Sequence, residues 1–366
     1  MTSTVASTNG RASGWRGLVA GHRPLVVLLP LSLALSWTIA LAHGTGAVPP
    51  ASQGLLAGPL TAVGGSPALG LLWWLWLAGA LVLLESTARR FGARDLVVIA
   101  IGAVLAVSPV TFWAVGWAGS DGPLLFFGAL AIWLATQVAD GRASSWWLVP
   151  VALVAGVFGV ATAAVFLIVL IQLIGVAVVR GGGWRQLIGA AVVALAASIV
   201  LPLIAAVAGI GSIPGTPPET GGQTLGPIGA ALGILNAMVD TGLGALSHRG
   251  VGLAGAPEYF YVALGWVIVA GVVIAFFQAR RSQAQAPLVV AVAAVALLTG
   301  PLLLVLVRAF YGEWLVLQPL GVAVLLPAFL VVTSTVIRNR GAAWLVIAWS
   351  GAVAVLGVVL AIVATG

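Results

Sequence analysis

Long apolar runs separated by short polar or charged segments make up the chain from residue 24 onward. A membrane-spanning α-helix needs about 20 mainly apolar residues, so this pattern predicts eleven spans. They are 24–42, 68–86, 95–113, 123–138, 146–160, 162–179, 187–210, 259–278, 287–310, 315–337 and 343–365. The predicted fold is an all-α polytopic membrane bundle over residues 24–366, preceded by a cytoplasmic segment at 1–23.

The amino-acid composition also indicates an integral membrane protein. Of the 366 residues, 61% are hydrophobic and only 6% are charged, and the mean hydropathy is +1.19. Soluble domains carry about a quarter charged residues. Although the net charge is +7, the basic residues stand singly or in pairs between apolar runs, which excludes a nucleic-acid-binding face. The absence of cysteine excludes thiolate metal sites and disulfides.

Charge placement predicts the orientation of the bundle. With eleven spans and a cytoplasmic N-terminus, every arginine except Arg249 and Arg308 lies on the cytoplasmic side, as the positive-inside rule requires. Lysine is absent, and Ala, Gly and Val are abundant, which is typical of a high-GC bacterial gene. We therefore expect a multi-pass protein of the bacterial plasma membrane.

Two segments have alternative interpretations. Span 24–42 could be a signal peptide cleaved after Ala40-Leu41-Ala42, but it is longer than a usual signal core. The apolar run 146–179 is too long for one straight span. We divide it at the small residues of 156–163, where two short helices could approach closely; one long kinked helix is the alternative.

Two external connections are long, namely 43–67 and 211–257. The second is predicted to begin irregularly. Its later part carries apolar residues at spacings of three and four, from Leu232 to Leu246, opposite Asn236 and Asp240. This spacing predicts a helix that lies in the outer membrane interface.

Several short motifs resemble the GT-C superfamily of membrane glycosyltransferases. They are Ser108-Pro109, the turn from Trp117 to Asp121 followed by Leu124-Leu125-Phe126-Phe127, the glycine-rich segment from Gly156 to Thr162, and Tyr311-Gly312-Glu313-Trp314-Leu315 with Pro319. The resemblance covers about 89–332. It implies a GT-C-like bundle that takes a sugar from a polyprenyl-phosphate carrier and transfers it, at the external face, to an envelope glycan, lipid or protein.

The chemistry of such a transfer requires an external carboxylate to deprotonate the acceptor and cations to hold the lipid-linked phosphate. The family usually places its carboxylate in the first external loop, but 43–67 contains no Asp or Glu. The candidate catalytic residues are therefore Asp121 and Glu313. The candidate phosphate-binding residues are Arg308, Arg249, His248 and His43.

Each candidate also has a structural interpretation. Asp121 could cap a helix N-terminus, Glu313 could simply pair with Arg308, and His248 with Arg249 could contact lipid headgroups nonspecifically. His43 could be an ordinary interfacial residue. The sequence indicates no metal-ligand cluster, and it leaves open whether a divalent cation takes part.

Two other functions remain as alternatives. The missing first-loop carboxylate also fits a noncatalytic membrane subunit or lipid-binding scaffold that works with a membrane protein partner. A secondary transporter is less favoured, because it would be expected to show inverted repeats and ionisable residues near the membrane midplane.

Overall fold

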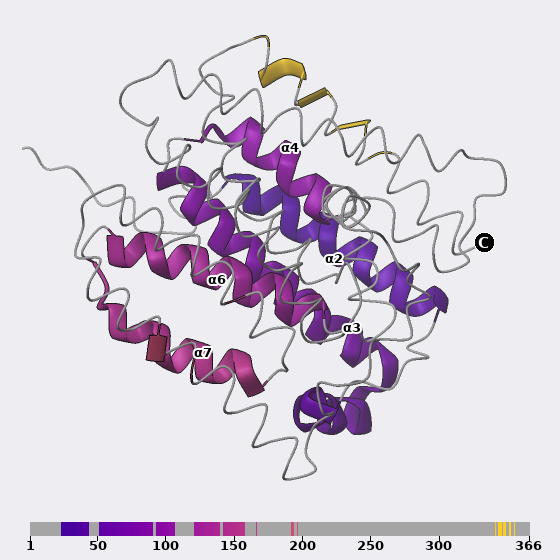
Figure 1. Cartoon of the computed structure of the whole chain (residues 1–366). Coiled ribbons are helices and arrows are strands. Elements are labelled where there is room, and N and C mark those ends of the chain that lie inside the picture. The colour runs from indigo at the N-terminus through magenta and orange to yellow at the C-terminus, as the bar shows by residue number, and fades with distance from the viewer. Residues whose placement is uncertain are drawn as a thin grey trace, which may run out of the picture.

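The computed structural model describes residues 23–43, 51–90, 93–106, 121–139 and 142–157, together with scattered residues between 166 and 355. All the elements within these residues are helical, which confirms the predicted all-α class for this part of the chain. The helices are α2 (Arg23–His43), α3 (Ala51–Arg90), α4 (Asp95–Ala106), α6 (Asp121–Ala139), the short 3₁₀ helix η1 (Ser145–Trp147) and α7 (Leu148–Val157). Their arrangement is shown in Figure 1.

The helices pack in pairs around one apolar core. Helix α2 contacts α3 and α4, α3 contacts α6, and α6 contacts α7. The core contains many leucines and alanines, and its largest fully buried side chains include Leu28, Leu84, Ile132 and Phe166. The small alanines allow the helix backbones to approach closely while the leucines fill the space between them.

Helices α3 and α6 are joined by aromatic side chains. The ring centroid of Trp76 lies 5.1 Å from that of Phe126, and the rings of Phe126 and Phe127 meet edge to face at 5.3 Å. Gly79 of α3 leaves room for this cluster, because a Cβ atom there would come within 2.7 Å of the Phe126 ring. Tilted and edge-to-face pairs are favoured arrangements of aromatic rings.

Helix α2 is fixed against both of its neighbours. The indole nitrogen of Trp74 in α3 donates a hydrogen bond of 3.1 Å to the Ser32 hydroxyl, which itself donates to the carbonyl of Leu29. On the α4 side, the methyl groups of Leu28 occupy the space that a Cβ atom would need at Gly102. A buried hydroxyl that both accepts and donates has its hydrogen-bonding needs met.

The start of α2, the end of α3, the start of α4 and the junction between α6 and α7 lie at one end of this bundle (Figure 1). We call it the basic end, because its described residues include Arg23, Arg89, Arg90, Arg94 and Arg142. Helix α2 therefore ends, and α6 begins, at the opposite end. These five arginines therefore share one end of the described helices.

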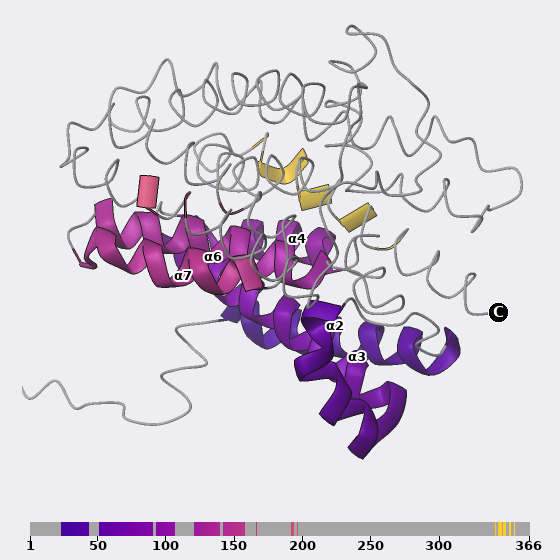
Figure 2. The ribbon, with the colours of Figure 1, turned by 60° about the horizontal axis from the view of Figure 1, so that its bottom comes forward.

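The structure corrects one expectation. We predicted an external connection over 43–67, but α3 is helical from Ala51. We took this segment as a connection because it lies between two apolar runs, and the structure accommodates its glycine and proline residues in a helix from residue 51 onward. The first part of α3 runs at an angle to the rest (Figures 1 and 2), as helices do where proline removes a backbone hydrogen bond.

Candidate functional site

Two of the predicted site residues lie at the end of the bundle opposite the basic end. His43 is the last residue of α2, and Asp121 is the first residue of α6. The structure places the backbone of each of these two residues. The start of a helix at Asp121 agrees with the expected position of this residue, since an acidic residue is favourable near the positive end of a helix dipole.

The other predicted site residues, His248, Arg249, Arg308 and Glu313, lie outside the described residues. The same holds for the predicted interfacial helix and for most of the proposed division at 156–163, which α7 reaches only as far as Val157. The candidates that the structure does describe, His43 and Asp121, lie at the same end of the described helices.

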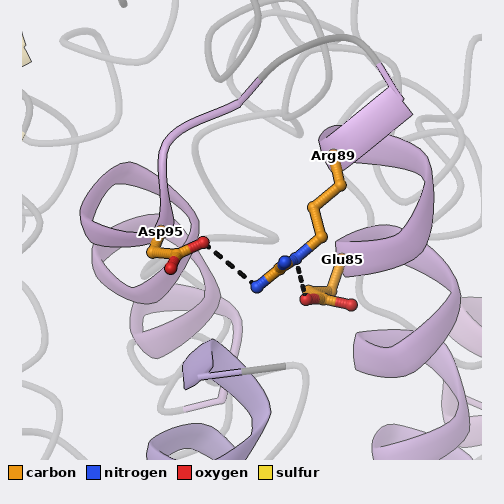
Figure 3. A network of polar contacts seen from close by, with 3 residues as sticks. All are labelled: Glu85, Arg89 and Asp95. Carbon is orange, nitrogen blue, oxygen red and sulfur yellow. Dashed lines mark hydrogen bonds and ion pairs between the residues drawn. The ribbon is translucent and has the colours of Figure 1, made fainter. Parts of the chain in front are cut away.

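The polar centre with described side chains lies at the basic end. It is formed by Glu85, Arg89 and Asp95, as Figure 3 shows. Arg89 Nε pairs with Glu85 Oε1 one helical turn earlier, and Arg89 Nη2 donates to Asp95 Oδ1 at 3.0 Å. One guanidinium thus connects the end of α3 to the start of α4.

Local sequence explains how this network forms. Glu85 and Arg89 are four residues apart on α3, the spacing that places two side chains on one helix face. The backbone N–H of Ala93 donates to the carbonyl of Ala88 at 3.0 Å, which closes α3 and directs the chain into α4. The charges also suit the helix dipoles, because Arg89 lies at a C-terminus and Asp95 at an N-terminus.

The members of the network differ in exposure. The side chain of Glu85 is 1% exposed, whereas that of Arg89 is 30% exposed and that of Asp95 is 43% exposed. A carboxylate removed from water needs a nearby cation and hydrogen bonds, because desolvating an unpaired charge is costly. Arg89 therefore neutralises the buried Glu85 carboxylate through Nε and binds the half-exposed Asp95 carboxylate through Nη2.

This network positions helices, because one guanidinium joins the end of α3 to the start of α4. Among the residues that the structure describes, no group of three or more His, Asp or Glu residues could hold a metal ion. We predicted no role for these charges, although the four-residue spacing of Glu85 and Arg89 could have indicated the pair.

The outward faces of the described helices carry large apolar side chains. Those more than about a third exposed are Val26, Val27, Leu71, Leu75, Val82, Leu96, Trp146, Trp147, Leu153 and Val154. They occur on α2, α3, α4, η1 and α7. Extensive apolar surface of this kind marks a membrane or protein contact. Within the described ranges, no helix is both long enough and apolar enough to count as a membrane span.

Comparison with known proteins provides no relative. The chain matches no protein-family model, no curated protein and no solved structure.

Proposed function

We propose that this chain is an integral membrane protein of the bacterial plasma membrane that transfers a sugar from a polyprenyl-phosphate carrier at the external face. One observation carries the proposal. Helices with apolar outward faces gather their arginines at one end, whereas α6 begins with the carboxylate residue Asp121 at the other. This polarity is the one expected if the basic end is cytoplasmic and Asp121 is external.

Membrane residence is supported by the balance of polar and apolar side chains. The 6% charged residues could not cover a structure of this size with a hydrated surface. Exposed apolar surface costs about 25 cal/mol per Å² in water. The exposed leucines, valines and tryptophans would be favourably placed against lipid.

In the proposed reaction, an acceptor hydroxyl oxygen attacks the anomeric carbon of the carrier-linked sugar. A bond forms between these two atoms, and the bond from the anomeric carbon to the phosphate oxygen breaks. Asp121 takes the proton of the acceptor, and polyprenyl phosphate leaves with the electron pair. Arg308, oriented by Glu313, is the proposed contact for the leaving phosphate, because guanidinium pairs well with two oxygens. His43, His248 and Arg249 are further candidates for this contact.

A second candidate function is a noncatalytic GT-C-like subunit or lipid-binding scaffold. The observation that favours it is the missing carboxylate between residues 43 and 67, the segment where the resembled family usually has one. Such a protein would depend on a membrane protein partner, and the purified chain would not turn over a lipid-linked sugar.

Turnover of a radiolabelled polyprenyl-phosphate sugar pool tests the proposal. Membranes containing the wild type should consume the pool, and membranes containing Asp121→Asn should lose at least about a hundredfold in rate, the usual contribution of a general base. Asp140→Asn makes the same chemical change on the predicted cytoplasmic side and serves as the matched control, with full activity expected.

Each variant must first be shown to remain in the membrane after alkaline extraction. Wild-type turnover that persists in Asp121→Asn would exclude this carboxylate. A pool that declines equally without the protein would exclude transfer by this chain and favour the noncatalytic subunit. Release of the wild type by alkaline extraction would refute membrane residence itself.

A further inference from the structure

Three helical segments begin at the basic end with the same order of exposed side chains. In α2 the exposed Arg23 precedes the exposed Val26 and Val27, and at α4 the exposed Arg94 precedes Leu96, which is 58% exposed. Before α7, the exposed Arg142 comes first, and exposed aromatic and then apolar residues follow it. A cation followed by apolar surface, repeated on separate elements, is the order found across a membrane interface.

The segment before α7 shows this order most fully. Trp146 and Trp147 are 65% and 60% exposed, although they are adjacent in sequence and large. About two helical turns later, Leu153 and Val154 are exposed as well. At about 1.5 Å per residue, Val154 lies about 10 Å beyond Trp147 along α7.

Local backbone structure fixes both tryptophans on the outside. The Ser144 side chain accepts a hydrogen bond from the backbone N–H of Trp146, and the Ser144 carbonyl accepts one of 3.1 Å from that of Trp147. Ser145 and Leu148, on either side of the pair, are buried. Because Ser145 and Leu148 are buried on either side of the two tryptophans, the turn is held with both indoles at the surface.

Arg142 is held close to this turn. Its backbone N–H donates to the carbonyl of Gln137 at 2.9 Å, and that of Ala143 donates to the same carbonyl at 3.3 Å. These bonds close the end of α6 and connect it directly to η1. The cation and the indole pair are thus carried by one fixed turn, with no flexible segment between them.

We infer that the basic end binds the phosphate groups of anionic phospholipids in the cytoplasmic leaflet through Arg94 and Arg142, with Trp146 and Trp147 at the level of the lipid carbonyls. This inference rests on the membrane residence proposed above. Charge complementarity selects the anionic lipid, because arginines outnumber carboxylates at this end and Arg89 already neutralises Glu85. The amphipathic indoles select the interface over an aqueous partner surface.

Lipid selectivity in reconstituted vesicles tests the inference. The full chain is placed in phosphatidylcholine vesicles that contain spin-labelled phosphatidylglycerol or spin-labelled phosphatidylcholine, and the motionally restricted fraction of each label is measured by electron spin resonance. The wild type should prefer phosphatidylglycerol. An Arg94→Gln/Arg142→Gln variant should lose about threefold to fivefold of this preference for each arginine removed, because each basic side chain near the headgroups contributes attraction of this order.

The matched control is Arg94→Lys/Arg142→Lys, which keeps the charge and should keep most of the preference. Raising the salt concentration should weaken the preference, since exposed charges are screened. A second measurement tests depth. Because the chain has no cysteine, a fluorophore on Trp147→Cys reports its position alone, and it should be quenched best by labels near the lipid carbonyls.

The outcomes separate this inference from the proposed function. Equal binding of the two lipids by the wild type, with the protein firmly retained after alkaline extraction, would overturn the lipid site and leave membrane residence standing; the basic end would then be free for a protein partner. An unchanged preference in the glutamine variant would also overturn it. Loss of the wild type from the vesicles would refute membrane residence and the lipid site together.

Discussion

Replacing Arg89 by methionine should destabilise the protein much more than replacing Asp95 by asparagine. Methionine fills similar space but removes the cation beside Glu85, whose side chain is only 1% exposed. Removing one partner of a fully buried ion pair costs about 3–5 kcal/mol. Because Arg89 is itself 30% exposed, water can reach the gap, and we expect a loss of about 2–3 kcal/mol from the free energy of unfolding.

The Asp95→Asn change breaks only the outer contact. Asp95 is 43% exposed, and ion pairs of this kind contribute about 0–1 kcal/mol. A difference of about 2 kcal/mol between the two variants corresponds to roughly thirtyfold in the equilibrium constant of unfolding. Purified protein in mixed detergent micelles, unfolded by increasing the denaturing detergent, would resolve this difference through a change in helical circular dichroism.

Two further variants make the test specific. Arg94→Met removes an exposed arginine from the same turn and should change stability by less than about 0.5 kcal/mol. The double variant Glu85→Gln/Arg89→Met removes both charges and should recover much of the loss, because replacing a whole buried pair is far less costly than breaking one. If Arg89→Met were as stable as Asp95→Asn, Glu85 would not depend on Arg89, and our description of the network would be refuted.

Two other contacts lead to predictions that the same unfolding assay can check. Gly79→Ala should cost about 1–3 kcal/mol, because the new Cβ atom would come 2.7 Å from the ring of Phe126, whereas Gly351→Ala, with nothing within 4 Å, should be neutral or stabilising. Equal effects of the two substitutions would contradict the close packing of α3 on α6. Ser32→Ala should cost about 1–2 kcal/mol by leaving the Trp74 indole without its acceptor, and it should have little effect once Trp74 is phenylalanine.

Much of the described helical structure could be predicted from the sequence. The apolar run 24–42 corresponds to α2 (Arg23–His43), and 123–138 corresponds to α6 (Asp121–Ala139). The predicted start at residue 95 is the start of α4. These agreements have a simple cause, because charged or polar residues stand at the ends of each run and mark where a helix begins or ends.

The start of α3 could not be predicted in the same way. We interpreted 43–67 as a connection because it lies between two apolar runs, and its glycine and proline residues would be unfavourable in an isolated helix. Local propensity is only a weak guide, and the helix Ala51–Arg90 continues through this segment. A proline in a helix can be tolerated where the helix bends and the freed carbonyl finds another partner.

The ion-pair network could be predicted only in part. The four-residue spacing of Glu85 and Arg89 indicates a pair on one face of a helix, but the sequence does not show that this face is buried. The contact with Asp95 depends on how the chain turns between α3 and α4, which is fixed by the hydrogen bond from Ala93 to Ala88. Side-chain burial and turn geometry are properties of the assembled helices.

The early start of α3 also limits which elements can supply a catalytic carboxylate at this end of the bundle. Because α2 ends at His43 and α3 begins at Ala51, the connection between them is confined to 44–50, and His43 is the only titratable side chain from residue 43 to residue 67. A carboxylate at this end of the bundle must therefore come from another element. Among the described helices, α6 begins there with Asp121. Among the described residues at this end, Asp121 is thus the available carboxylate, beside the imidazole of His43, which is why the Asp121→Asn variant is the most informative single substitution for the proposed activity.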